Sequence, residues 1–165
     1  MQAGCRKFDP CQVHQILSEF KLLHLINDFT DKFFSFLLED PVRPNIPQVD
    51  RIGNNKDIFV MRDEEDKVQA ITCVSYQTNV PSSEAELFEM CDDPKVAIFY
   101  TIWSYKAGAG RQLIFDAVKY IKENRKDINR FITLSPKTEM ARRFHIKNGA
   151  VVFRDNMETV NYEYL

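Results

Sequence analysis

The sequence lacks the features that mark disulfide-rich, metal-binding, membrane and nucleic-acid-binding proteins. Its four cysteines show neither a CxxC spacing nor a Cys/His metal pattern, so we expect reduced thiols, no metal and a cytoplasmic location. Residues 1–7 have no apolar core of a signal peptide, and no stretch approaches the ~20 apolar residues of a membrane span. With 22 Lys and Arg against 24 Asp and Glu, the net charge of −2 gives no overall attraction to nucleic acid or to an anionic membrane.

The composition instead predicts an ordered globular protein. An apolar fraction of 44% and 13 phenylalanines argue against disorder. A chain of 165 residues can build one substantial core and is too short for two comfortable ones. We therefore expect a single domain over residues 1–165.

The most specific stretch is a glycine-spaced loop between an apolar run and a helical pattern. Residues 96–103 are apolar on both alternating faces, which predicts a central strand buried on both sides. After the loop, an apolar stripe at helical spacing predicts a helix; its members are Leu113, Ile114, Ala117, Val118 and Ile121. Gly108 and Gly110 leave room for a ligand near the first N–H groups of that helix, which favours an anion. Lys106 and Arg111 add positive charge nearby.

Spacing excludes two common phosphate loops. A Walker loop needs Gly-Lys-Ser/Thr after four residues, and neither Gly108 nor Gly110 is followed by such a pair. A dinucleotide fingerprint would need a third glycine, and Leu113 occupies its place. A tight strand-to-helix turn without any ligand is the remaining alternative to another kind of anion loop.

The other segments predict a mixed order of helices and strands. Before the glycine loop we expect a short strand at residues 6–8, a helix that begins at Asp9 and Pro10 and continues to Asn27, a second helix over residues 29–38, an extended connector over residues 41–47 and a hairpin around the acidic turn 63–66. After it we expect a strand at residues 131–134, a helix from Ser135 to Gly149 with Met140, Ala141 and Phe144 buried, and two terminal strands. The N-terminal aromatic residues are expected to be core.

The acidic segment at residues 80–94 has two interpretations. A run of this kind is usually a solvated face. Because it leads into the buried central strand, Glu84, Glu86 and Glu89 could also form a wall for a cationic substrate.

Two motifs resemble those of the GNAT superfamily of acyl-CoA-dependent N-acyltransferases. The first is the glycine loop, where Gly108 and Gly110 match the family pattern and Tyr105 stands in place of its Arg or Gln. The second is the late helical stretch TEMARRFHIKNGA. In it Ala141, Phe144, Lys147 and Gly149 match, while Thr138, His145 and Ala150 replace the family's Asn, Tyr and Phe. The order of predicted elements also agrees over most of the chain.

The resemblance implies an α/β fold with a mixed, mostly antiparallel sheet, splayed central strands and flanking helices. It also implies acetyl-CoA as co-substrate, with its pyrophosphate on the glycine loop and its pantetheine arm along the preceding strand. The cofactor-binding residues implied are Ile102, Trp103, Ser104, Tyr105, Lys106, Ala107, Gly108, Ala109, Gly110, Arg111 and Thr138.

The implied activity is transfer of an acetyl group to a primary amine of a small molecule or peptide, by direct attack and by a monomer or homodimer. His145 occupies the position where the family commonly places its proton donor, so it is the candidate catalytic residue, with simple packing as the alternative. An unperturbed imidazole has a pKa of about 6.5 and would titrate near neutrality. Glu84, Glu89, Asp92 or a water chain could act as base, and a non-catalytic acyl-CoA or protein-binding module of the same fold is the rival function.

Overall fold

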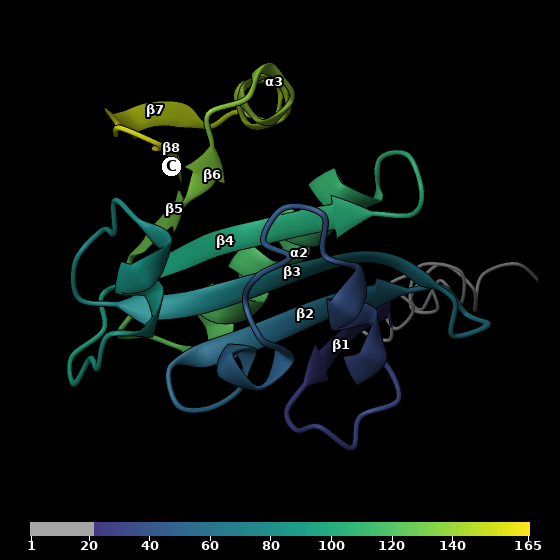
Figure 1. Ribbon diagram of the computed structural model, residues 1–165. Coiled ribbons are helices and arrows are strands. Elements are labelled where there is room, and N and C mark those ends of the chain that lie inside the picture. Colours follow the sequence, from purple (N-terminus) through teal and green to yellow (C-terminus); the bar gives the residue numbers. More distant parts are fainter. Residues whose placement is uncertain (1–21) are drawn as a thin grey trace, which may run out of the picture.

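Residues 22–165 are described by a computed structural model, which arranges them around one sheet with helices on its faces (Figure 1). In chain order the elements are β1 (Leu23–Ile26), the 3-10 helices η2 (Phe34–Glu39) and η3 (Gln48–Arg51), β2 (Lys56–Arg62), β3 (Val68–Gln77), the 3-10 helix η4 (Glu84–Phe88), β4 (Val96–Ser104), α2 (Ala109–Asn124), β5 (Arg130–Thr133), β6 (Ser135–Pro136), α3 (Glu139–Lys147), β7 (Val151–Asp155) and β8 (Thr159–Tyr164). The strand predicted at residues 6–8 and the helix start at Asp9 lie outside the described residues. That residues 1–165 form a single domain stays a prediction.

The strands follow the order β1-β2-β3-β4-β5-β8-β6, and β7 pairs with β8. All neighbouring strands are antiparallel except β4 and β5, which are parallel. The hairpin predicted around residues 63–66 is present as β2 and β3. The predicted class, a mixed α/β fold with a mostly antiparallel sheet, is confirmed.

The two parallel strands separate after a short stretch of pairing. β4 and β5 are in register only from Val96 and Arg130 to Phe99 and Thr133, and the N–H of Leu134 then donates to Phe99 O at 3.0 Å. β4 continues along β3 to Ser104, while the chain after β5 turns away to pair with β8 as β6. Figure 1 shows β5 and β6 leading from β4 toward α3. The predicted splay of the central strands is therefore present.

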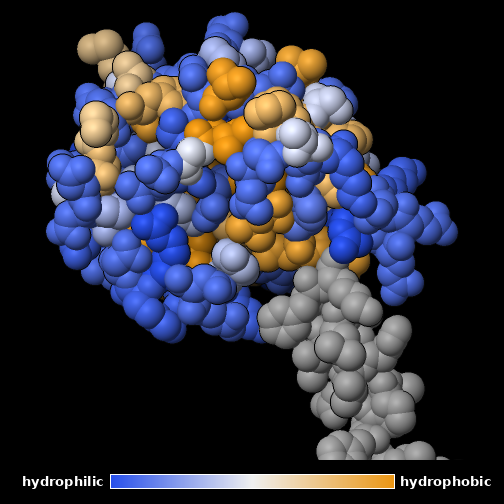
Figure 2. Space-filling view, turned by 90° about the horizontal axis from the view of Figure 1, so that it is seen from below, coloured by the Kyte–Doolittle hydropathy of each residue, from blue (hydrophilic) through white to orange (hydrophobic). Residues whose placement is uncertain are grey.

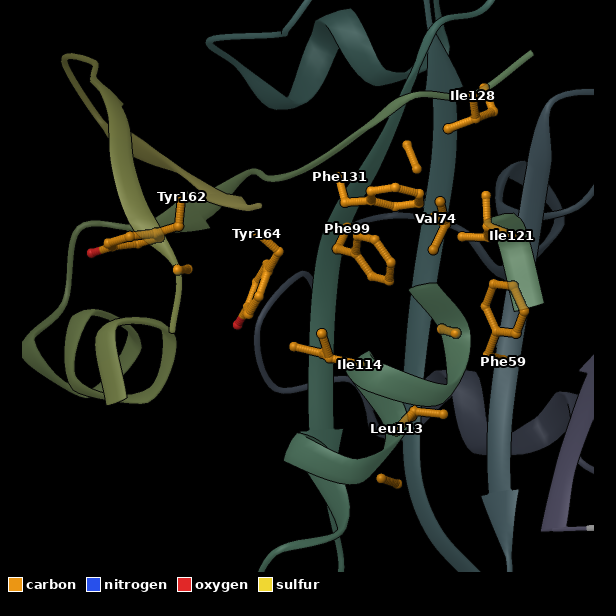
Figure 3. Packing of buried hydrophobic residues seen from close by; sticks show 14 of the residues in the cluster. Phe59, Val74, Phe99, Leu113, Ile114, Ile121, Ile128, Phe131, Tyr162 and Tyr164 are labelled. Atoms are coloured by element: carbon orange, nitrogen blue, oxygen red, sulfur yellow. The ribbon is translucent and has the colours of Figure 1, made fainter. Parts of the chain in front are cut away.

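Helix α2 covers one face of the sheet through the apolar stripe that the sequence predicts. Leu113, Ile114 and Ile121 are at most 1% exposed. In Figure 3 they lie against Phe59 and Phe99 of the sheet. Burying each such side chain stabilises a fold by about 1.5–3 kcal/mol. The stripe therefore holds the start of α2, and the glycine loop before it, at a defined place beside β4.

The last helix begins later than predicted. The sequence placed its N-cap at Ser135, but Ser135 and Pro136 pair with Val160 and Thr159 of β8. The N-cap is Thr138, whose hydroxyl accepts a hydrogen bond from the N–H of Ala141 at 3.2 Å. A proline at a two-residue edge strand loses little because few ladder bonds are needed there.

The buried face of α3 also differs from the prediction. Met140 is 83% exposed and was expected to be buried, whereas His145 is 4% exposed. His145 lies four residues after Ala141, on the face of α3 that meets Tyr162 and Tyr164 of β8, whereas Met140 lies off that face. The helix gives way at Gly149, which has a φ of 94°, as the sequence predicts.

The predicted N-terminal helices are wrong within the described residues. Leu23–Ile26 is an edge strand paired with Ile58–Met61 of β2, because tertiary pairing overrides the helical spacing of this apolar run. Of the predicted second helix only the 3-10 helix η2 forms. Phe33 is buried as expected of a core residue, but Phe29 is 72% exposed. The 41–47 connector was expected to be extended, yet it folds into turns, with Ile46 N–H donating to Arg43 O at 3.3 Å.

The surface of the described residues is mixed in character. In Figure 2 hydrophobic side chains lie near the centre and along the top of the view, with hydrophilic ones between and below them. None of the helices formed by residues 22–165 is long and apolar enough to cross a bilayer.

Candidate active site

A cavity of about 360 Å³ lies where β4 separates from β5 and β6. It extends from α2 and α3 at one end to Pro41 and Val42 at the other. Most of its surface is apolar. The residues that line it are Pro41, Val42, Phe99, Tyr100, Thr101, Ile102, Trp103, Ser104, Gly110, Ile114, Leu134, Ser135, Pro136, Thr138, Met140, Ala141, Phe144 and His145.

The edge of β4 beside the cavity has free backbone groups. Tyr105 N–H donates to Gln69 O next to β3, at 2.7 Å. Because peptide groups alternate in direction along an antiparallel strand, those of Ser104 and Ile102 point away from β3. β5 has already ended at Thr133 and does not pair with them. This edge can therefore hydrogen-bond an extended ligand.

The glycine loop ends at the first turn of α2. Gly108 has a φ of 82°, a left-handed conformation that only glycine adopts without cost, and it is the N-cap of α2. A Cβ added at Gly110 would lie 3.5 Å from the ring of Phe144, so the start of α2 and α3 are in close contact. The first N–H groups of α2 have no acceptor within the helix. An anion at this position would meet the positive end of the helix dipole.

The structure brings together about half of the residues predicted to bind acetyl-CoA. Ile102, Trp103, Ser104, Gly110 and Thr138 line the cavity. The others belong to the adjoining loop and the first turn of α2, outside the cavity lining; they are Tyr105, Lys106, Ala107, Gly108, Ala109 and Arg111. Lys106 and Arg111 are exposed, and Arg111 stacks over Phe115.

Tyr105, which stands where the family has Arg or Gln, has a structural partner on each side. Its hydroxyl accepts from Trp103 Nε1 and donates to Glu39, at 3.0 Å in each case. The ring also contacts Phe36 edge-on. Tyr105 therefore ties η2 to the end of β4, next to the cavity.

His145 is the buried imidazole of α3 and lines the cavity. Its Nε2 is 3.0 Å from Ser135 Oγ and its Nδ1 is 2.8 Å from the Tyr164 hydroxyl. The ring stacks on Tyr162 at a centroid distance of 4.9 Å. Three aromatic and hydroxyl neighbours thus fix its orientation.

The hydrogen bonds around His145 define one consistent set of donors. Ser135 Oγ donates to Thr133 Oγ1 at 2.8 Å, so it accepts the proton of His145 Nε2. His145 Nδ1 then accepts from Tyr164. This arrangement fits a neutral imidazole with its proton on Nε2. We call Thr133, Ser135, His145 and Tyr164 the neutral network.

Burial changes the titration expected of His145. Desolvation lowers the pKa of His145 to about 4, from an ordinary value of 6.5. The sequence predicted titration near neutrality, so that expectation is corrected. Burial likewise raises the pKa of Tyr164. Both groups are therefore uncharged at neutral pH.

Sequence reasoning gave Ser135 only a secondary place and missed Tyr164. Ser135 was interpreted as a helix cap and Tyr164 as part of an alternating terminal strand. The two side chains meet His145 because β6 and α3 both pack against β8. One signal could have pointed to Ser135: it is a polar residue directly after a buried strand, where the central strands separate.

A second buried polar cluster lies at the Pro41 end of the cavity. Arg51 Nη1 donates to Asp40 Oδ2 at 2.6 Å, and both side chains are almost fully buried. Asp40 Oδ1 accepts from the hydroxyl of Thr101 on β4 at 2.8 Å and from the N–H of Val42 and Arg43. We call Asp40, Arg43, Arg51 and Glu84 the charged cluster.

Two carboxylates of the acidic segment are engaged by neighbouring side chains, and its use as a wall for a cationic substrate stays a prediction. Glu84 pairs with Arg43 at 3.2 Å. Glu86 accepts hydrogen bonds from Ser82 and Ser83, and the hydrogen bonds from Ser82 lower its pKa. Among residues 22–165 no group of three His, Cys, Asp or Glu side chains could hold a metal ion.

No protein-family model and no curated protein matches the sequence. Solved structures do match. Malonyl-CoA decarboxylase from Rhodopseudomonas palustris has 19% identity and a TM-score of 0.64, over 96% of this chain and 64% of that one. The chain therefore spans less than two thirds of that decarboxylase.

Two acetyltransferase structures match over most of both chains. The GNAT domain of PAT from S. lividans has 13% identity and a TM-score of 0.58, over 86% of this chain and 88% of that one. A Bacillus subtilis acetyltransferase in complex with CoA has 13% identity and a TM-score of 0.55, over 86% of this chain and 93% of that one. At these identities the similarity establishes the fold alone. The described chain has the GNAT fold.

Proposed function

We propose that this protein acts on an acyl-CoA in the cavity between β4 and β5, and that it removes CO2 from a short acyl group with a free carboxylate, as in malonyl-CoA. One observation carries the proposal. The cavity is apolar, no carboxylate or amine side chain of residues 22–165 lines it, and its imidazole is neutral and bonded to Ser135. Such a site offers a proton donor but no base for an ammonium group.

The acyl-CoA fits the groups around the cavity. The open edge of β4 at Ile102 and Ser104 would pair with the pantetheine arm, and Trp103 and Thr138 would border it. The pyrophosphate would lie at the start of α2, beside Tyr105, Lys106, Ala107, Gly108, Ala109, Gly110 and Arg111. The acyl group would then extend toward Ser135 and His145. Acetyl-CoA, the co-substrate that the sequence predicts, is the product of malonyl-CoA decarboxylation. It would occupy the same place in the cavity.

An apolar cavity suits loss of CO2. A carboxylate with its charge on two oxygens is poorly stabilised there, while the transition state spreads that charge toward the thioester. The bond between the carboxylate carbon and the α-carbon breaks, and its electron pair passes to the thioester oxygen as CO2 leaves. The α-carbon then takes a proton from Ser135, which His145 Nε2–H restores, and solvent supplies the net proton. The R. palustris decarboxylase, with the same fold, is a precedent for this chemistry.

The second candidate is the acetyl transfer from acetyl-CoA to a primary amine that the sequence predicts. Two observations favour it: the glycine loop lies at a helix start beside an open strand edge, and the S. lividans and B. subtilis structures share the fold. His145 would protonate the departing sulfur through Ser135. A small molecule or peptide would be the acceptor, and a monomer or homodimer in the cytoplasm would be the active form.

Mass spectrometry separates the two reactions. The purified protein is incubated with malonyl-CoA alone and, separately, with acetyl-CoA and a panel of amines and peptides. We expect conversion of malonyl-CoA to acetyl-CoA and its loss in Ser135→Ala. Acetylated amines without decarboxylation would favour the second candidate. Binding of acyl-CoA without either product would identify a non-catalytic module, and no binding to any acyl-CoA would overturn both.

A further inference from the structure

The side chain of Arg43 connects the two strands that separate at the cavity. Its Nε donates to Tyr100 O on β4 at 3.3 Å, and its Nη2 donates to Leu134 O, directly after β5, at 2.8 Å. Its Nη1 donates to Glu84 of η4 at 3.2 Å. The guanidinium thus replaces the ladder bonds that β4 and β5 no longer make.

The backbone of Arg43 is fixed as firmly as its side chain. Its N–H donates to Asp40 Oδ1 at 3.0 Å, and its carbonyl accepts from Arg51 Nη2 at 2.8 Å. The side chain is 11% exposed. Because both ends of the residue are bound, little freedom remains for the guanidinium to swing out of the gap.

Arg43 lies directly behind the end of the cavity. Tyr100 and Leu134, whose carbonyl groups it binds, line the cavity, as do its neighbours Pro41 and Val42, but Arg43 itself does not. The opposite end, at α2 and α3, is where the proposed function places the acyl-CoA. A second reactant that did not share the path of the acyl-CoA would enter through the gap that Arg43 fills.

We propose that Arg43 is a specificity-determining residue that closes this second entrance, so that amines cannot reach an acyl-CoA held in the cavity. The inference rests on the proposed acyl-CoA site. An amine nucleophile is positioned by acceptor groups that hold its N–H bonds, and the two carbonyl groups that could do so where β4 and β5 separate are already bound to Arg43. Glu84, which could attract an ammonium group, is also engaged by Arg43.

The test compares wild-type protein with Arg43→Ala and Arg43→Gln, and uses Arg62→Ala as the matched control. Arg62 pairs with Asp66 at the end of β2 and does not line the cavity. Release of CoA thiol from acetyl-CoA is followed with and without propylamine, and acetylated propylamine is identified by mass spectrometry. We expect amine-dependent release to rise at least about tenfold in Arg43→Ala. Added guanidinium ion, below denaturing concentrations, should suppress that increase by refilling the gap.

A second measurement does not depend on turnover. The chain contains one tryptophan, Trp103, which lines the cavity, so quenching of its fluorescence by acrylamide reports access to the site. Quenching should increase in Arg43→Ala and Arg43→Gln and return toward the wild-type level with guanidinium ion. Arg43→Gln serves if Arg43→Ala does not fold.

Three results would overturn the inference: wild-type aminolysis as fast as in the variants, unchanged aminolysis in folded variants that still bind acetyl-CoA, or unchanged quenching of Trp103. Failure of the proposed function has a different signature. Calorimetry would then detect no acyl-CoA binding to any of the proteins, and the quenching result alone would decide whether Arg43 closes the gap.

Discussion

The two polar clusters beside the cavity differ in charge. The neutral network of Thr133, Ser135, His145 and Tyr164 is a set of hydroxyl groups and one uncharged imidazole. The charged cluster holds a buried Asp40–Arg51 pair and the Arg43–Glu84 pair. A neutral network can pass a proton without burying a new charge, whereas a buried ion pair is costly to disturb. We therefore infer that the first cluster serves chemistry and the second holds the shape of the cavity.

The charged cluster should matter most for folding. Asp40→Ala leaves the Arg51 guanidinium buried without its partner and removes the anchor of the loop on Thr101. Losing one partner of a buried pair costs about 3–5 kcal/mol. In a chain of this size that lowers Tm by roughly 10 °C. Calorimetry or thermal denaturation measures the shift.

Asp66→Ala is the matched control, because Asp66 pairs with Lys32 and Arg62 at an exposed position. Surface pairs contribute about 0–1 kcal/mol. Equal Tm values for Asp40→Ala and Asp66→Ala would show that the buried pair contributes no more to stability than the exposed pairs.

The neutral network should make stability depend on pH. The pKa of His145 falls to about 4 on folding, so as the pH decreases the unfolded chain takes up this proton first. The contribution of neutral His145 to the free energy of unfolding is complete above pH 6.5. It is lost as the pH falls to 4, by up to about 3 kcal/mol. Urea denaturation between pH 7 and pH 4 measures it. A His145→Phe protein should lack this part of the loss, and the same pH dependence in both proteins would contradict a neutral buried imidazole.

Catalytic activity should depend on the hydrogen bonds of the neutral network and not only on the packing of its side chains. His145→Phe keeps an aromatic ring but removes both hydrogen bonds, so kcat should fall by ~10²-fold, typical of losing a general acid. Acetyl-CoA affinity should change little, and His145→Tyr should recover part of the rate. Because the pKa of His145 is about 4, the acidic limb of the wild-type profile should lie near pH 4 and not near 6.5.

His24→Phe is the control for this variant, since His24 pairs with Asp31 at the edge of the sheet and does not line the cavity. Full kcat with an unchanged pH profile in His145→Phe would make His145 a packing residue. The proton donor would then be Ser135 alone or solvent.

The smallest change in the protein, a substitution of a single glycine at the start of α2, should abolish ligand binding. At a hundred times its Kd, acetyl-CoA should stabilise the fold by about 2.7 kcal/mol. Gly110→Glu should abolish this stabilisation, because a carboxylate would occupy the proposed pyrophosphate position. Gly110→Ala controls for folding, since its Cβ would make an ordinary 3.5 Å contact with Phe144. A thermal shift that survives in Gly110→Glu would place the pyrophosphate elsewhere.

The acidic segment illustrates what charge patterns in a sequence leave open. Residues 80–94 could be a solvated face or a wall for a cationic substrate, and the composition fits both. In the folded chain Glu84 accepts a hydrogen bond from Arg43, 41 residues away, and Glu86 accepts hydrogen bonds from two serines. A carboxylate's partner depends on contacts that are distant in sequence, so its role is decided only when those contacts form.

The strand, glycine loop and helix at residues 96–124 follow from local patterns, because burial on both faces, left-handed φ at Gly108 and helical spacing are local properties. The edge strand Leu23–Ile26 is the counterexample, since pairing with β2 overrode a helical pattern. The meeting of Ser135, His145 and Tyr164, and the burial that keeps the imidazole neutral, arise only when the chain is folded. Hydrogen-bond partners and desolvation depend on elements that pack together from separate parts of the chain, and no local pattern encodes them.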